Sequence, residues 1–423
     1  MLQIAAIRDN VEQVKELFKI KNFKELDLVD KVVKLDEDRR KTQHQLDEQL
    51  SESKKIAKSI GALYQSGKQD EANALRDKTT SLKESNKQLE DSLSSIEKDL
   101  HDTMVQLPNI PHESVPPGNS DEDNVSIKEV GEIPTLYEGA KPHWELLEQY
   151  DLMSLDLGSK ITGAGFPVFM GKGAKLQRAL VAYFLDNAIE AGYKEVIPPL
   201  LVNEATAYAT CQLPDKEGQM YEVTNDGLYL IPTAEVPITN IYRDTIVKKE
   251  DFPIKLTGHS QCFRREAGSY GAHVRGLNRV HQFEKVEVVQ IVEPSKSYEV
   301  LDEMVTYVEK IVQSLGLPYR ILRLCGGDLS FASALTYDFE VFTVAQDRWL
   351  EVSSVSNFRT FQSNRLKVRY KGEDGKNQLC HTLNGSALAL PRIIAALLEN
   401  NQTAEGIVIP EVLRPYTGFD IIS

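Results

Sequence analysis

The densest group of residues able to bind a charged ligand lies between positions 263 and 283, in the stretch FRREAGSYGAHVRGLNRVHQF. Arg264 and Glu266 stand near its start, and Arg279 and Phe283 near its end. Apolar residues at both edges predict two strands joined by a loop. The loop carries three glycines, which are Gly268, Gly271 and Gly276.

Strand alternation would place Arg264 and Glu266 on one face of the first strand, and Arg279, His281 and Phe283 on one face of the second. A guanidinium group can neutralise phosphates, and a carboxylate can accept a hydrogen bond from an exocyclic amine. A phenyl ring stacked on a base contributes ~1–3 kcal/mol. Together these groups would hold ATP, although the stretch taken alone is equally consistent with a surface hairpin whose charges are solvated.

The elements around this stretch begin with a long polar segment, from about residue 26 to residue 107, that is almost free of aromatic residues and proline. Its apolar residues repeat every seven positions, which is typical of the a/d seam of a coiled coil. The sequence Ser66-Gly67-Lys68 predicts the point where the chain folds back. Each arm of ~40 residues, at about 1.5 Å per residue, would reach ~60 Å. The seam residues are Leu28, Val32, Leu35, Leu46, Ile56, Ile60, Leu63, Leu75, Leu82, Leu89, Leu93, Ile96, Leu100 and Leu107.

On either side of the heptads the sequence changes character. The first ~25 residues predict a small amphipathic helix, and four prolines and an acidic run predict a linker at 108–125. From residue 126 to residue 423, strands rich in β-branched residues alternate with helices. This pattern predicts the α+β class, with a mixed, largely antiparallel sheet flanked by helices. The expected strands are 196–202, 227–232, 285–292 and 334–344, and the expected helices are 174–191 and 297–315.

The composition limits the classes of function. The chain has 423 residues, of which 41% are hydrophobic and 26% charged, and no apolar run is long enough for a membrane span. The four cysteines are far apart without a C-x-x-C pair, which predicts no zinc site and fits a reducing cytoplasm. The net charge of −14 argues mildly against general affinity for nucleic acid, so RNA contacts would need local groups of cations.

Three stretches together resemble the class II aminoacyl-tRNA synthetases. F-R-x-E, a loop and R-x-x-x-F resemble motif 2 of that class. The stretch GYKEVIPP (192–199) resembles motif 1, which implies a homodimer interface. The stretch GSALALPRIIAALLEN (385–400) resembles motif 3, with Arg392 just inside a helix that Pro391 opens.

Further stretches narrow the resemblance to the bacterial seryl-tRNA synthetases, and it covers essentially the whole chain. IPTAEVPITN (231–240) contains the T-A-E signature, PNIPHESVPPG resembles the hinge after the helical arm, and EVSSVSNFRTFQSNR (351–365) and HTLNGSALALPR (381–392) match the same family. The resemblance implies an enzyme that activates serine with ATP and transfers it to serine tRNA, and to selenocysteine tRNA. Residues 1–107 would then be the tRNA-binding domain with its arm, and 126–423 the catalytic domain.

The resemblance also implies a role for each site residue. Arg264 would bridge the serine carboxylate and the α-phosphate, and Glu351 with Ser354 would hold Mg²⁺, which prefers oxygen ligands. Phe283 and Arg392 would sandwich the base. The residues implied to act in catalysis are Arg264, Glu351 and Arg392. Those implied to line the rest of the ATP site are Arg265, Glu266, Arg279, Val280, Phe283, Val352, Ser353 and Ser354. Those implied to form the serine pocket are Thr233, Ala234, Glu235, Glu287, Asn384 and Ser386.

The sequence departs from the family at three places, none of which removes an implied phosphate or serine ligand. These are Gly165-Phe166, Val355-Ser356-Asn357 and Asn364-Arg365. His273 and His281 lack a metal-ligand spacing and are expected to be polar loop residues.

Two alternatives come from other classes of protein. One is a paralogue that loads a carrier protein, although such paralogues tend to lack the arm. The other is a coiled-coil scaffold without activity, which would not need the charged residues of motifs 2 and 3.

Overall fold

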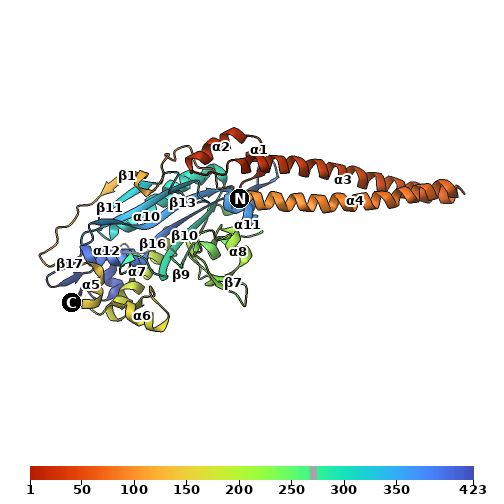
Figure 1. The fold of residues 1–423 in the computed structure, drawn as a ribbon. Helices are drawn as coiled ribbons and strands as arrows, with labels where there is room; N and C mark the ends of the chain where they lie inside the picture. The colour runs from red at the N-terminus through yellow and green to blue at the C-terminus, as the bar shows by residue number, and fades with distance from the viewer. Residues whose placement is uncertain (267–273) are drawn as a thin grey trace. The chain divides into compact units, whose positions relative to one another are not determined.

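The computed structural model of the chain describes residues 1–266 and 274–423 (Figure 1). It divides into two compact units. The helical unit comprises Met1–Lys19 and Phe23–Pro108, and the sheet unit comprises Ile20–Asn22 and Asn109–Ser423. The expected loop residues Gly268, Gly271 and His273 lie outside the described residues.

The helical unit is built on two long helices, α3 (Asp27–Gln65) and α4 (Gln69–Met104), which pack against each other. Figure 1 shows them in red and orange. The chain reverses at Gly67, whose φ of 77° is a left-handed conformation that glycine adopts without strain. Hence the fold-back predicted at 66–68 is confirmed. The first residues form two helices, α1 (Ile4–Arg8) and α2 (Val11–Ile20), so the prediction of one helix is wrong.

Burial along α3 and α4 follows the predicted seven-residue repeat. Val32, Leu46, Leu93 and Leu100 are buried, and the remaining seam residues are buried or half-buried. A seam between only two helices leaves many of its apolar side chains partly open to solvent, because each is covered by residues of a single partner helix. The antiparallel coiled-coil arm predicted from the heptads is therefore confirmed.

The sheet unit is organised around one eight-stranded sheet, in which neighbouring strands run antiparallel except for the β4–β9 pair. This confirms the predicted α+β class. In sheet order the strands are β1 (Val125–Val130), β11 (Tyr319–Arg323), β12 (Leu335–Thr343), β13 (Arg348–Arg359), β16 (His381–Ala389), β10 (Gln282–Val292), β9 (Ile254–Phe263) and β4 (Lys194–Glu195). The smaller sheets contain β2 (Met153–Ser154), β3 (Val168–Phe169), β5 (Leu201–Asn203), β6 (Tyr221–Val223), β7 (Leu228–Leu230), β8 (Ile246–Val247), β14 (Arg369–Lys371), β15 (Asn377–Leu379), β17 (Gln402–Thr403), β18 (Gly406–Val408) and β19 (Ile421–Ile422). The helices are α5 (His143–Gln149), α6 (Leu155–Ile161), α7 (Gly171–Glu190), α8 (Glu204–Ala209), α9 (Glu235–Asn240), α10 (Ser297–Ser314), α11 (Thr360–Leu366), α12 (Leu390–Asn400) and α13 (Arg414–Thr417).

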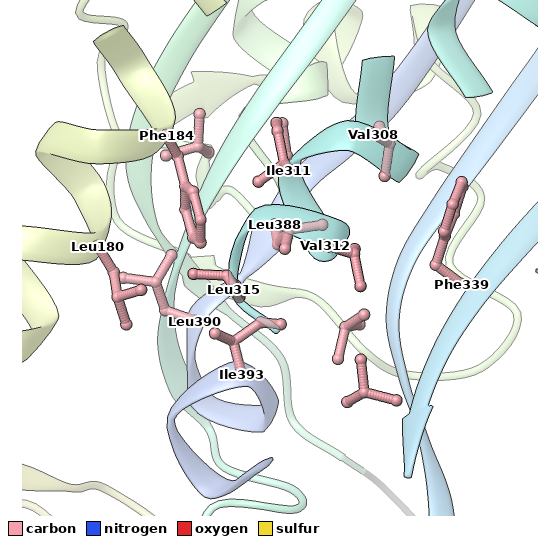
Figure 2. Packing of buried hydrophobic residues seen from close by; sticks show 14 of the residues in the cluster. Leu180, Phe184, Val308, Ile311, Val312, Leu315, Phe339, Leu388, Leu390 and Ile393 are labelled. Carbon is pink, nitrogen blue, oxygen red and sulfur yellow. The ribbon is translucent and has the colours of Figure 1, made fainter. Parts of the chain in front are cut away.

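A large hydrophobic core fills the space between the sheet and helices α7, α10 and α12 (Figure 2). Val286 and Val288 of β10 and Leu383 of β16 belong to this core. Because side chains alternate along a strand, Glu287 and Asn384 point to the opposite face of the sheet. That face carries the polar residues of the candidate site.

Two sequence expectations about local structure are wrong. Pro198 and Pro199 interrupt the strand expected at 196–202, because proline cannot donate to a ladder, and only β5 forms there. The expected linker at 108–125 contains the buried Asn109, whose amide donates to the carbonyls of Ala332 and Phe358, both at 2.8 Å. That segment also contains the first residue of β1.

The second wrong expectation concerns the charged residues of motif 2. Strand β9 ends at Phe263, so Arg264 and Glu266 follow the strand rather than lying on it. Glu266 has a φ of 47°, which breaks the alternation of a strand. Arg279 and His281 likewise precede β10, which begins at Gln282. No helix within 1–266 and 274–423 is long and apolar enough to cross a membrane.

Candidate active site

Strands β9 and β10 bring the two ends of motif 2 together. They pair antiparallel, with Phe283 opposite Cys262, and the backbone N–H of Arg264 donates to the carbonyl of His281 at 3.0 Å. The Arg264 guanidinium lies 5.4 Å from the centre of the Phe283 ring. Its Nε donates to the Pro232 carbonyl at 3.4 Å. Thus a half-buried cation and an aromatic face adjoin each other, an arrangement that can bind the phosphates and the base of a nucleotide.

The remaining charged residues of motif 2 face one another or a neighbouring strand. Arg279 Nη1 and Glu266 Oε2 form an ion pair at 2.8 Å, which joins the two sides of the loop. Arg265 Nε donates to the Met220 carbonyl at 2.9 Å, and its guanidinium lies 4.9 Å from the Tyr221 ring. Arg265 is therefore held against β6.

His281 is packed rather than exposed. Its ring stacks on Phe166 with centroids 5.3 Å apart, and Gly165 approaches so closely that a Cβ there would lie 2.3 Å from the ring. The Gly165-Phe166 departure from the family pattern thus sits against the end of motif 2. His281 lies in the loop just before β10, as expected, and its ring is also part of the packing there.

A second charged group lies where β13 meets the start of α12. Arg392 Nη1 donates to the Glu351 backbone carbonyl at 2.7 Å and lies 3.4 Å from its carboxylate. Ser354 Oγ lies 3.4 Å from Glu351 Oε1. Desolvation opposes the charge on Glu351, but Arg392 and Arg264 hold the pKa of its carboxyl below the usual value.

The predicted serine pocket is a buried hydrogen-bond network around Glu287, which is 0% exposed. Asn384 Nδ2 donates to Glu287 Oε1 at 2.8 Å, and Thr233 Oγ1 donates to Oε2 at 3.2 Å. Thr233 Oγ1 in turn accepts from the backbone N–H of Glu235 at 3.2 Å. Ser386 lies directly opposite Glu287 in the β10–β16 register. Four of the six predicted pocket residues are thus joined by hydrogen bonds.

Two buried carboxylates near each other make this pocket electrostatically unusual. Burial, and then the charge of Glu287, raise the pKa of Glu235 to about 7. Burial also raises the pKa of Glu287, although Lys285 opposes that shift. A pocket rich in carboxylate oxygens suits a small ligand that offers donors, as the ammonium and hydroxyl groups of serine do.

Arg264 acts electrostatically on both groups of residues. Its positive charge opposes the rise in the pKa of Glu235 in the serine pocket and contributes to the lowered pKa of Glu351 beside Arg392. Its Nε donates to the carbonyl of Pro232, the residue directly before the pocket residue Thr233, so it lies beside the pocket. An arginine in this position can neutralise charge that develops between an amino acid and a phosphate.

The other predicted site residues are largely buried. Val280 is 4%, Ala234 0% and Val352 1% exposed, so contacts with a ligand would come through their backbone. The side chain of Val352 belongs to the hydrophobic core. Ser353 Oγ donates to the carbonyl of Ser386 at 2.6 Å, which ties β13 to β16.

The sequence reasoning missed three residues of the site. Lys285 Nζ lies 2.6 Å from Glu287 Oε2, and both side chains are buried. Gln362 Nε2 donates to Glu235 Oε1 at 2.7 Å, and Gln362 Oε1 accepts from Thr382 at 2.8 Å. The K-x-E spacing in β10 would have identified Lys285, because alternate residues share a face. Gln362 lies on α11 and has no such signal.

The third missed residue is Asp338 on β12, opposite Ser354 on β13. Burial and the neighbouring charge of Glu351 hold the pKa of Asp338 well above its usual value. Its Oδ1 is buried and has no hydrogen-bond partner within the described residues. The oxygens of Glu351, Ser354 and Asp338 are hard donors of the kind that Mg²⁺ prefers. In the part of the chain that is described, no cluster of three or more His, Cys, Asp and Glu side chains suited to a metal occurs.

The helical arm contains cations that differ in their surroundings. Asp36 is 1% exposed and pairs with Arg39 at 2.9 Å and Arg40 at 3.1 Å. Lys54, Lys55 and Lys58 are exposed along α3, as is Arg76 on α4. The two arginines already neutralise a buried carboxylate, so the lysines are the more available partners for phosphates.

The chain matches two family models. The model of the seryl-tRNA synthetase N-terminal domain matches residues 1–111, and that of the class II tRNA synthetase core domain (G, H, P, S and T) matches residues 220–401. A serine–tRNA ligase of Salinibacter ruber is 48% identical over 99% of this chain and 98% of its own length. A serine–tRNA ligase of Chlorobaculum parvum is 43% identical, with 100% of both chains covered.

A solved structure is similar throughout. The crystal structure of seryl-tRNA synthetase from Pyrococcus horikoshii complexed with ATP has a TM-score of 0.94 and 34% identity. The match covers 100% of this chain and 99% of that one.

Proposed function

The chain belongs to the seryl-tRNA synthetase family of class II aminoacyl-tRNA ligases, and on that premise we propose the reaction and the residues that carry it. The protein activates L-serine with ATP and transfers the seryl group to the 3′ end of serine tRNA, and of selenocysteine tRNA. The observation that carries the proposal is the position of Arg264, whose guanidinium lies 5.4 Å from the centre of the Phe283 ring and donates to the carbonyl of Pro232, the residue directly before the pocket residue Thr233.

In the first step the serine carboxylate attacks the α-phosphorus of ATP. A bond forms from a carboxylate oxygen to phosphorus, the bond to the β-phosphate oxygen breaks, and pyrophosphate leaves. Negative charge accumulates on the α-phosphate oxygens as this happens. Arg264 faces that charge with a guanidinium that neighbouring contacts already orient, so little reorganisation is needed.

The nucleotide is held by residues of motifs 2 and 3. Phe283 and Arg392 sandwich the adenine, and Arg265 and Glu266 border its edge. Arg279 and Val280 border the nucleotide, together with the backbone of Val352 and Ser353. The stacking of Arg264 on Phe283 and the Arg392–Glu351 contact support this assignment.

Serine is held by Thr233, Ala234, Glu235, Glu287, Asn384 and Ser386. The buried carboxylates of Glu235 and Glu287 accept from the ammonium and hydroxyl groups of the substrate. An amino acid without the hydroxyl would leave these acceptors unpaired. Sites built to bond a substrate hydroxyl discriminate against the analogue without it by about 10⁴–10⁵-fold.

Mg²⁺ would be held by Glu351 and Ser354, whose oxygens suit it, and when bound it would reduce the charge of the phosphates. The chain's own contribution is the orientation of the carboxylate by the ion pair with Arg392.

In the second step a terminal hydroxyl of the tRNA attacks the carbonyl carbon of seryl-adenylate, and AMP leaves. We assign residues 1–107 to tRNA binding and 126–423 to catalysis. The match of the N-terminal family model to residues 1–111 supports this assignment. The arm would contact the phosphates of the tRNA through exposed lysines.

The same proposal includes a homodimer in the cytoplasm, formed through motif 1. Strand β4 lies at the edge of the sheet, and Ile197 beside it is 90% exposed. An unpaired edge with an exposed isoleucine is a favourable surface for a second copy.

Exchange of labelled pyrophosphate into ATP tests the first step, and acylation of tRNA tests the second. Exchange should depend on serine alone among the amino acids. If serine supported exchange but no seryl group reached tRNA, the carrier-loading alternative would be favoured.

A further inference from the structure

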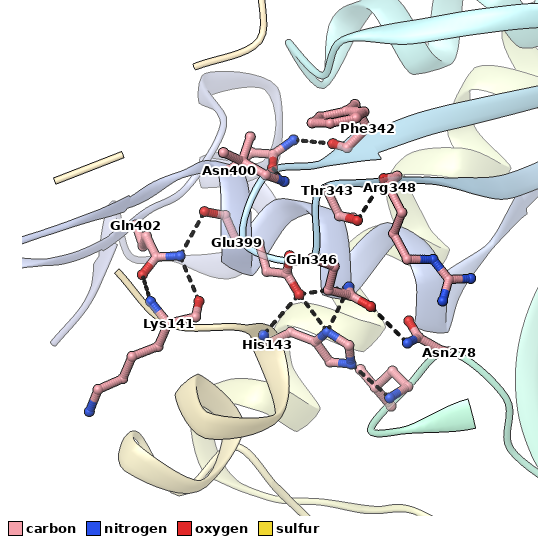
Figure 3. Close-up of polar contacts among 12 residues, drawn as sticks. Lys141, His143, Asn278, Phe342, Thr343, Gln346, Arg348, Glu399, Asn400 and Gln402 are labelled. Atoms are coloured by element: carbon pink, nitrogen blue, oxygen red, sulfur yellow. Dashed lines mark hydrogen bonds and ion pairs between the residues drawn. The ribbon is translucent and has the colours of Figure 1, made fainter. Parts of the chain in front are cut away.

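A buried histidine–glutamate pair lies beneath the end of motif 2, away from the residues assigned to substrate. His143 begins α5 and Glu399 lies near the end of α12, and both side chains are 0% exposed. His143 Nδ1 and Glu399 Oε1 are 2.7 Å apart (Figure 3). Glu399 falls near the end of the stretch that resembles motif 3, but neither residue is among those assigned above to bind substrate.

The hydrogen bonds fix which nitrogen of His143 carries the proton. The backbone N–H of Leu277 donates to His143 Nε2 at 2.9 Å. A backbone N–H can only donate, so Nε2 must be the unprotonated acceptor. The proton is therefore on Nδ1, which donates to Glu399.

One carboxylate oxygen of Glu399 accepts three hydrogen bonds. Its Oε1 accepts from His143 Nδ1, from the His143 backbone N–H at 2.9 Å, and from Gln346 Nε2 at 2.8 Å. Gln346 Oε1 then accepts from Asn278 Nδ2 at 2.8 Å. Two branches from Glu399 thus reach consecutive residues of the chain, Leu277 through His143 and Asn278 through Gln346.

The segment held in this way leads directly to the proposed ATP site. The Asn278 carbonyl accepts from Arg392 Nε at 3.2 Å, and Arg279 is the next residue. A Cβ on Gly276 would lie 2.3 Å from His143 Nε2, and its φ of 66° is left-handed, so the close approach requires glycine. Arg275 lies 4.7 Å from the ring of Trp144.

A carboxylate in this position is costly for stability. Within the described residues, Glu399 Oε2 and Asn278 Oδ1 are buried without a hydrogen-bond partner. Apolar side chains of similar volume would fill such a site at lower cost. The polar residues are therefore better explained by the position in which they hold the neighbouring backbone than by a contribution to stability.

We infer that His143, Glu399 and Gln346 form a positioning network that fixes the Leu277–Asn278 backbone and thereby orients Arg392 and Arg279 toward ATP. None of the three touches substrate. The inference rests on the proposed function, because Arg392 and Arg279 are assigned to the nucleotide only there. Loss of the network should therefore weaken the binding of ATP and not that of serine, because the serine pocket is built from other residues.

The test compares three variants. Gln346→Leu removes the branch to Asn278, and His143→Phe removes the branch to Leu277. Gln402→Leu is the matched control, because Gln402 is buried in the same cluster and bonds Lys141 and the Glu399 carbonyl. No hydrogen bond of Gln402 within the described residues reaches 276–279.

The readouts are the dissociation constant of ATP with Mg²⁺ by calorimetry without amino acid, the KM values for ATP and serine in pyrophosphate exchange, and the melting temperature. Gln346→Leu and His143→Phe should weaken ATP binding about tenfold or more while the serine KM stays within about twofold. Gln402→Leu should lower the melting temperature without changing either constant.

Gln346→Leu changes a half-buried residue, so it remains informative if His143→Phe does not fold. ATP binding by both network variants within about twofold of wild type would overturn the inference, as would an equal loss in Gln402→Leu. Wild-type protein that binds ATP but shows no serine-dependent exchange would refute the proposed function instead. Wild-type protein that does not bind ATP would refute both.

Discussion

Replacing Arg264 by alanine is expected to slow serine-dependent pyrophosphate exchange by about 10²–10³-fold, because one preorganised charge contact to the transition state contributes ~3–4 kcal/mol. The local geometry supports a value in this range. Arg264 is half-buried, its orientation is set by Phe283 and by the Pro232 carbonyl, and it acts on two carboxylates. The loss should fall on kcat more than on the KM for serine.

Two further variants make this prediction specific. Arg264→Lys should recover little activity, because an ammonium group lacks the planar fork that contacts two oxygens at once. Arg414→Ala is a matched control, since Arg414 is another half-buried arginine whose Nε donates to a backbone carbonyl, that of Ile409 at 3.1 Å. Exchange by Arg264→Ala within about threefold of wild type would refute the assigned role.

Four other predictions follow from the site and the arm. Glu287→Gln and Ser386→Ala should raise the serine KM strongly and leave ATP binding nearly unchanged, which calorimetry with ATP alone would check. Because the pKa of Glu235 is raised to about 7, the serine KM should fall as the pH rises through that value, and Glu235→Gln should abolish the inflection. The folded state binds this proton more tightly than the unfolded state, whose value is 4.5, so the free energy of unfolding should decrease as the pH rises from 4.5 to about 7. Zinc-selective chelation should not change activity, whereas removal of Mg²⁺ should abolish it; an effect of the zinc chelator would contradict the cysteine argument. Replacing residues 27–104 with a short glycine–serine linker should preserve exchange but lower charging of tRNA by about 10²-fold or more, and substitution of Lys54 and Lys55 should reduce the salt dependence of tRNA binding. Near-normal charging by the armless protein would show that the arm does not bind tRNA.

The periodic parts of the chain were predictable from the sequence. Heptads from Leu28 to Leu107 predicted both long helices, because the apolar residues of each repeat lie on the same buried face, and Ser66-Gly67-Lys68 predicted the turn between them. Asp36 could not be predicted, since the residues that neutralise it include Arg8, which is distant in the sequence.

The motifs predicted which residues form the candidate site but not the backbone conformation around all of them. Arg264 and Phe283 adjoin as expected, whereas the strand alternation assigned to Glu266 fails at its positive φ. Backbone conformation at the end of a strand depends on the loop that follows, which a pattern of apolar residues does not encode.

The residues missed altogether are polar groups buried by long-range packing. Glu399 lies near the end of the apolar helix α12, a sequence position typical of a solvated carboxylate, yet its partner His143 is 256 residues away. Gln362 and Glu235 are similarly separated, by 127 residues. Such pairs become visible only when the sheet brings their elements together.

The most direct test of the account is the acylation of total tRNA by the purified protein with each of the standard amino acids in turn, in the presence of ATP and Mg²⁺. The account predicts that serine alone becomes attached, and that the product is lost when Arg264 is replaced by alanine. Attachment of a different amino acid, or serine-dependent exchange without any acylated tRNA, would contradict it.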